Sequence, residues 1–185
     1  AQQPEKRIAL VVGNAAYAKS PLATAANDAG LIAQTLQAAG FDVIGARDLD
    51  GDTLRKSFRD FINKAETSGP DTVAMVYLAG YGLQLAGDNY FVPVDSAINR
   101  DTDVPIEALR VGDYVRQLAS LPLKAGIVLT ASLGDGGVTG LGWAAEATVS
   151  GPDGPEVRPL VEVDLPDAAA ELDRLGTHLG LGWAR

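Results

Sequence analysis

The sequence predicts an α/β fold in which a mainly parallel sheet is covered by helices on both faces. Short apolar runs alternate along the chain with longer segments whose apolar residues recur at helical spacing, which is typical of strands joined by crossover helices. The apolar runs are continuous, as expected for strands that are buried on both faces. The chain has 185 residues, which favours a single domain.

Two strands and a helix are predicted at the start of the chain. Residues 7–12 form an apolar run that Gly13 follows, which indicates a buried strand. Residues 25–39 place apolar side chains on one helical face, and Gly40 follows them as a helix stop. Residues 41–46 then predict the second strand.

A second helix and a third strand follow. Asp50 and Asp52 offer N-cap oxygens to a helix that ends before Gly69. Residues 72–79 are entirely apolar and predict a buried strand, which we expect Gly80-Tyr81-Gly82 to end.

The remaining elements of the front part are a hairpin, a helix and a strand. Residues 83–85 and 90–92 flank a Gly-Asp turn and predict a small hairpin. Residues 113–121 predict a short helix, and residues 125–131 a fourth strand. We expect the four parallel strands to lie in the order 2-1-3-4.

The tail differs in composition, because Gly and Pro are about twice as frequent after residue 132 as before it. Residues 143–149 and 157–163 predict strands, and residues 167–175 predict a helix. We therefore divide the chain into a core, 6–133, and a divergent or shortened completion of the same domain, 134–185.

Composition excludes several classes of function. There are 15 Lys and Arg against 24 Asp and Glu, a net charge of −9 that argues against nucleic-acid binding. No apolar run approaches the ~20 residues of a membrane span. The chain has no Cys and a single His, His178. Disulfides, a Cys nucleophile and multi-His metal sites are therefore excluded, and we expect neither a metal nor a cofactor.

The first residue is Ala1 rather than Met. A start of this kind is compatible with removal of a signal peptide. We expect a periplasmic or secreted protein, with the cytoplasm as the alternative.

The candidate site lies where the strands end, because ligands of open parallel sheets bind outside the carboxyl ends of the strands. Tyr81 follows the third predicted strand between two glycines, which are expected to expose its side chain. Ser132 follows the fourth predicted strand. A site at this edge would use both residues.

Four blocks of the sequence carry a resemblance to a known family. They are RIALVVGNAAY (7–17) with ANDA (26–29), MVYLAGYG (75–82), GDNYFVPVD (87–95) and IVLTASL (127–133). In order and spacing these blocks resemble the bacterial branch of the caspase and metacaspase family. The resemblance covers roughly residues 6–133 and implies a three-layer caspase-like sandwich. By this resemblance Tyr81 and Ser132 match the catalytic His and Cys positions, and they are 51 residues apart, against about 50 in the caspase pattern.

The chain departs from the family at the residues that carry its chemistry. Tyr81 replaces the His, Ser132 the Cys, Thr130 an Asp and Leu133 an Arg. In the metacaspase-like branch, two acids line a pocket for basic side chains. Asp28 matches the first acid, whereas Thr130 does not match the second. The resemblance thus implies a family member with a Tyr–Ser pair.

These replacements predict the loss of peptide cleavage. The family's nucleophile is a thiolate formed beside an imidazole, whereas a Ser hydroxyl is a poor nucleophile without a base. Tyr, with an ordinary pKa near 10, is a poor base at neutral pH. We expect a pseudoenzyme that acts as an interaction or regulatory module for a protein or peptide partner. The alternatives are an atypical hydrolase using Ser132 and a small-molecule-binding module.

Each candidate residue also has a purely structural interpretation. Tyr81 could be an aromatic residue that packs on the sheet edge, and Ser132 an ordinary turn residue. Asp28 could cap a helix or complement its dipole. His178, in the Gly-rich tail, is interpreted as a surface or half-buried residue rather than a base for Ser132.

Overall fold

The structure is a computed structural model that describes residues 5–19, 21–22, 25–133, 141–151 and 154–160. For 125, 127, 129–133, 141–151 and 154–160 it describes the backbone. The predicted helix 167–175, the end of the predicted strand 157–163 and His178 lie outside the described residues.

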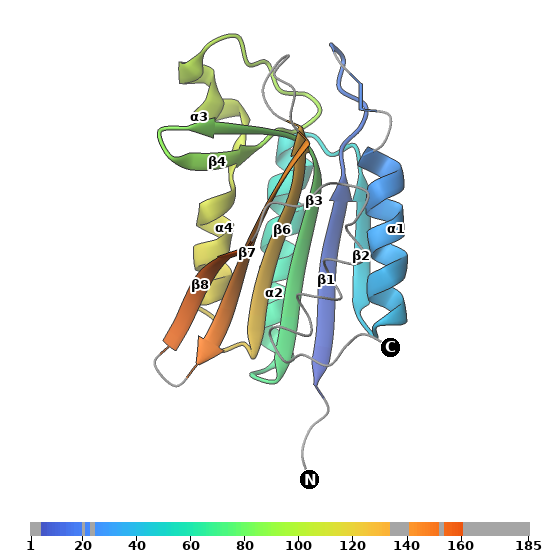
Figure 1. Ribbon diagram of the computed structural model, residues 1–185, viewed down its shortest axis with the longest axis vertical. Helices are drawn as coiled ribbons and strands as arrows, with labels where there is room; N and C mark the ends of the chain where they lie inside the picture. Colours follow the sequence, from blue (N-terminus) through green and yellow to red (C-terminus); the bar gives the residue numbers. More distant parts are fainter. Residues whose placement is uncertain (1–4, 20, 23–24, 134–140, 152–153, 161–185) are drawn as a thin grey trace.

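Four parallel strands form the centre of the sheet (Figure 1). Their order is β2 (Asp42–Arg47), β1 (Lys6–Gly13), β3 (Thr72–Leu85) and β6 (Ala125–Leu133). This confirms the predicted order, 2-1-3-4. Each crossover between neighbours passes through a helix, as parallel pairing requires.

Two antiparallel strands extend the sheet beyond β6. They are β7 (Leu141–Gly151), which pairs with β6, and β8 (Gly154–Leu160), which pairs with β7. The strand predicted at 143–149 lies within β7, and the part of 157–163 that the structure describes lies in β8.

One face of the sheet is covered by α2 (Gly51–Ser68) and α4 (Val111–Ala119), which lie behind it in Figure 1. Phe58 and Phe61 of α2 join apolar residues of β1, β3 and α4 in one buried cluster. The helix begins as predicted, because the Asp50 carboxylate accepts a 2.7 Å hydrogen bond from Thr53 N. This cap fixes where the chain turns from β2 into the helix.

The opposite face is covered by α1 (Ala25–Ala38), whose Ala29, Ile32 and Leu36 are buried. The helix approaches the sheet so closely that a Cβ at Gly13 would lie 2.8 Å from Ala29 Cβ. Gly13 therefore permits the contact. Helices on both faces make the molecule a caspase-like three-layer sandwich.

The expectation that Gly80-Tyr81-Gly82 ends the third strand is wrong. β3 continues to Leu85, staying parallel to β6 as far as the pair Tyr81–Leu133. Gly80 does not form a turn; it allows two side chains to approach the backbone of β3 closely. A Cβ there would lie 2.6 Å from the Tyr17 hydroxyl and 3.0 Å from the Phe91 ring. A glycine in an extended backbone lets these two side chains in without breaking the strand.

The predicted hairpin is the extension of β3. Its last residues pair antiparallel with β4 (Asp88–Phe91), Leu83 opposite Tyr90, and the turn places Ala86 and Gly87 at positive φ. β4 then pairs with β5 (Leu109–Arg110) after the 3₁₀ helix η1 (Asp101–Asp103) and α3 (Val104–Glu107). Figure 1 shows this group above the carboxyl ends of the parallel strands.

Candidate functional site

Asn14 connects three segments at the carboxyl edge of the sheet. Its side chain is completely buried, and Oδ1 accepts a 2.9 Å hydrogen bond from Leu49 N in the loop before α2. Its Nδ2 donates to Val92 O at 3.4 Å, just after β4. The amide therefore ties the ends of β1 and β2 to the hairpin.

Tyr17 holds the backbone at Tyr81. Its hydroxyl donates a 2.6 Å hydrogen bond to Val92 O and accepts one of 3.1 Å from Tyr81 N. Burial raises the pKa of Tyr17 above its ordinary value, so the phenol stays protonated and keeps donating. This role could not be predicted from the sequence, although Tyr17 ends the first block that resembles the family.

The Tyr81 side chain is half-buried and packs against Tyr17. The ring centroids are 4.7 Å apart with an interplanar angle of 67°, an edge-on contact. Tyr81 also belongs to an apolar cluster centred on Tyr90 and Val92. The ring is thus held in place by its neighbours, as in the structural interpretation of this residue.

The register between β3 and β6 determines how Tyr81 and Ser132 lie relative to one another. Tyr81 pairs with Leu133, whereas Ser132 pairs with Gly80. The two positions are therefore on adjacent strands but one residue out of register. Thr130 pairs with Leu78, two residues earlier on each strand than the pair of Ser132 and Gly80.

Asp28 lies in the first turn of α1, close to β3. Burial raises the pKa of its carboxyl group, and its charge adds to burial in raising the pKa of Tyr77. Tyr77 is fully buried in β3, four residues before Tyr81. Asp28 thus sits on the α1 face of the same strand that carries Tyr81, and its position also complements the helix dipole.

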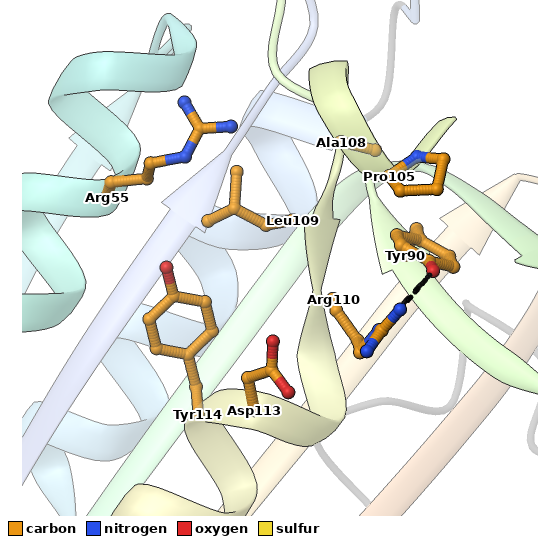
Figure 2. Close-up of a pocket in the computed structure, with 8 residues that line it drawn as sticks. All are labelled: Arg55, Tyr90, Pro105, Ala108, Leu109, Arg110, Asp113 and Tyr114. Atoms are coloured by element: carbon orange, nitrogen blue, oxygen red, sulfur yellow. Dashed lines mark hydrogen bonds between the residues drawn. The ribbon is translucent and has the colours of Figure 1, made fainter. Parts of the chain in front are cut away.

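A separate cavity of about 300 Å³ lies between α2, α4 and the paired strands β4 and β5 (Figure 2). Arg55, Arg110 and Asp113 supply its charges, and Tyr90 and Tyr114 its phenols. Neither Tyr81 nor Asp28 lines it. Its residues are scattered from 55 to 114, so no local motif could have shown it.

The described part of the chain contains neither a cluster of metal-ligating residues nor a helix that could span a membrane. No group of three or more His, Cys, Asp and Glu among those residues could hold a metal ion. Within the same ranges, every helix is too short or too polar to cross a membrane.

The fold and its strand-edge site define a domain of the caspase-like class. The family model of the caspase domain matches residues 6–159, so the chain belongs to the caspase-domain family. The match includes β7 and most of β8 as well as the parallel strands.

Among solved structures, the chain is similar to the Drosophila initiator caspase Dronc. The two share 13% sequence identity with a TM-score of 0.45, and the match covers 69% of this chain and 55% of that one. This chain therefore spans little more than half the length of that caspase. A search of curated proteins finds no match.

Proposed function

We propose that this caspase-family domain does not cleave peptides and acts as an interaction or regulatory module. The proposal is supported by the match to the caspase-domain family, together with the sequence resemblance that aligns Tyr81 and Ser132 with the family's catalytic dyad. Neither a Ser nor a Tyr side chain is the thiolate or the imidazole on which the family's reaction depends. We assign the chain to a bacterial branch of the family with this Tyr–Ser pair.

The surroundings of Tyr81 support a binding role. Its backbone N–H donates to Tyr17, and its ring packs against that of Tyr17. A general base must instead move a proton to and from a reacting group within hydrogen-bond reach. A phenol held in a packed cluster is better suited to presenting a fixed surface.

The partner would bind along the carboxyl edge, between Asp28 and the β3–β4 hairpin. Asp28 supplies the family's first-loop acid, while Thr130 removes the second acid of the pocket. Half of the negative charge for a basic side chain is therefore missing. We expect a protein or peptide partner that is recognised through shape and backbone contacts more than through a basic anchor.

The proposal is tested by peptide hydrolysis. The purified chain is incubated with fluorogenic peptides ending in Arg, Lys or Asp, beside Ser132→Ala. Loss of a catalytic dyad costs roughly 10⁴- to 10⁶-fold in rate, so both proteins should give only background release. Turnover that disappears in Ser132→Ala would show an active enzyme.

The alternative is a hydrolase that uses Ser132 as its nucleophile. Its basis is that Tyr81 and Ser132 lie on adjacent strands, β3 and β6, although one residue out of register. A serine-directed phosphonate separates the two functions, because it adds covalently only to an activated Ser. Intact-mass analysis should show an unmodified chain, whereas an adduct mapped to Ser132 would favour the hydrolase.

A further inference from the structure

β2 is a free side edge of the sheet. It ends the strand order β2-β1-β3-β6-β7-β8, and in the described part of the chain it pairs with β1 alone (Figure 1). The pairing with β1 is regular over all six residues of β2 and contains no bulge. An uninterrupted edge of this length is a template on which another strand can pair.

The backbone groups of alternate residues point outward from this edge. Asp48 N, just after β2, donates a 3.0 Å hydrogen bond to Gly13 O on β1. N–H directions alternate along an extended strand, so the odd-numbered residues of β2 face away from β1. These are Val43, Gly45 and Arg47. No residue in the described ranges bonds to their N–H and C=O groups, which are therefore available to a further strand.

Both faces of the sheet are open beside this edge. Ile44 pairs with Leu10 of the cluster under α2, so it lies on the α2 face, where it is 38% exposed. Gly45 lies on the opposite face, and a Cβ there would meet nothing within 4 Å. Proteins commonly protect an edge strand with a charge, a Pro or a bulge. Residues 43–46 are Val-Ile-Gly-Ala and have none of these.

The strand is complementary to itself when two copies pair antiparallel. A twofold axis through Ile44, perpendicular to the sheet, places Ile44 of one copy opposite Ile44 of the other on the α2 face. Val43 then lies opposite Gly45 on the α1 face, so the larger side chain lies beside the open space at the glycine, twice. Val43 and Gly45 both face outward, so each such pair exchanges two backbone hydrogen bonds, and Ile44 forms the closely spaced pair between them.

The charges at the two ends of β2 also favour antiparallel pairing. Asp42 begins the strand and Arg47 ends it. Antiparallel pairing brings the acidic end of one copy to the basic end of the other, whereas parallel pairing brings like charges together. Asp42 forms a 2.6 Å ion pair with Lys64, and Arg47 has no ion-pair partner in the described ranges. The charge of Arg47 is therefore available to the partner's acidic end.

We propose that two copies of this chain associate through their β2 strands, antiparallel about a twofold axis at Ile44, so that their sheets become one continuous sheet. The same residues meet on both sides, as a twofold dimer requires. A single strand pair is a small interface, so the dimer is reversible. The surface is the side edge of the sheet rather than its carboxyl edge, and it goes beyond the proposed function.

Association is measured by sedimentation equilibrium of the whole chain between about 10 µM and about 1 mM, a range suited to weak interfaces. The mass should rise with concentration from 19.2 kDa toward twice that value. Ile44→Lys places two like charges opposite one another and should weaken association about tenfold or more. Ile106→Lys is the matched control, because Ile106 is an apolar residue of α3 that is 71% exposed, and it should associate like the original chain.

Single cysteines test the register and do not rely on a charged substitution. The chain has no Cys, so any disulfide comes from the introduced residue. In a closely spaced antiparallel pair the Cα atoms lie about 4.5 Å apart, which a disulfide can span. Oxidation of Ile44→Cys with copper–phenanthroline should therefore give a disulfide-linked dimer, in much higher yield than Ile106→Cys. Circular dichroism reports that each variant is folded.

Three results would overturn the proposal: a mass of one chain at every concentration; association of Ile44→Lys that equals that of Ile106→Lys; or equal yields of disulfide-linked dimer from the two cysteine variants.

Discussion

At the residue scale, a single amide holds the carboxyl edge together. Asn14 is completely buried, and its side-chain amide accepts a hydrogen bond from Leu49 N and donates one to Val92 O. Its position directly after β1 gives it access to both segments. An apolar residue of similar size would leave a buried N–H unpaired.

We therefore predict that Asn14→Ala lowers the free energy of unfolding by about 1–3 kcal/mol, the cost of an unsatisfied buried group. Urea denaturation followed by circular dichroism measures it. Asn63→Ala, on the exposed side of α2, is the control and should change stability by no more than ~0.5 kcal/mol. Equal effects at the two positions would refute the bonding role of Asn14.

Two glycines should respond to alanine with opposite signs. A Cβ at Gly80 would overlap the Tyr17 hydroxyl and the Phe91 ring, whereas one at Gly30 in α1 meets nothing within 4 Å. Gly80→Ala should cost about 1–3 kcal/mol through overpacking. Gly30→Ala should stabilise the helix by about 0.5–1 kcal/mol. Thermal unfolding compares them, and a tolerated Gly80→Ala would mean that the strand has room for a side chain.

At the element scale, the N-terminus of α2 should make stability depend on pH. Hydrogen bonds from the backbone and side chain of Thr53 lower the pKa of Asp50. A lowered folded pKa contributes stability above the ordinary value near 4, and this is lost as the pH falls through the folded value. Asp50→Ala should thus be less stable than the original chain at neutral pH, by a margin that narrows in acid.

The measurement is the urea midpoint of both proteins between about pH 7 and pH 2.5. Asp50→Asn is the matched control, because an amide oxygen caps almost as well but does not titrate. It should retain most of the stability and lose the pH-dependent part. A gap between Asp50→Ala and the original chain that stays constant down to pH 2.5 would exclude a charged cap.

Local chemistry explains why most elements could be predicted. Asp50 caps the start of α2 through its side chain. Gly40 follows α1 and adopts the positive φ that commonly ends a helix. The extent of β3 could not be predicted, because Gly80 usually signals a turn. Gly80 is needed here because Tyr17 and Phe91 pack against it, and these residues are distant in sequence and reach it only in the folded chain.

At the scale of the whole molecule, the strand order and layering followed from the alternation of apolar runs and helical segments. The motifs placed Tyr81 and Ser132 on neighbouring strands, and β3 and β6 do pair there. Their one-residue offset in register could not be predicted, because pairing between β3 and β6 depends on the whole sheet. The cavity lined by Arg55 and Arg110 could not be predicted either, because residues of two helices and of β4 and β5 form it only in the folded chain.

We propose that this caspase-family domain has lost its peptidase chemistry. The rate of peptide hydrolysis by the purified chain, measured beside Ser132→Ala and Tyr81→Phe, tests this. All three rates should equal the buffer background. A rate above background that falls on either substitution would contradict it.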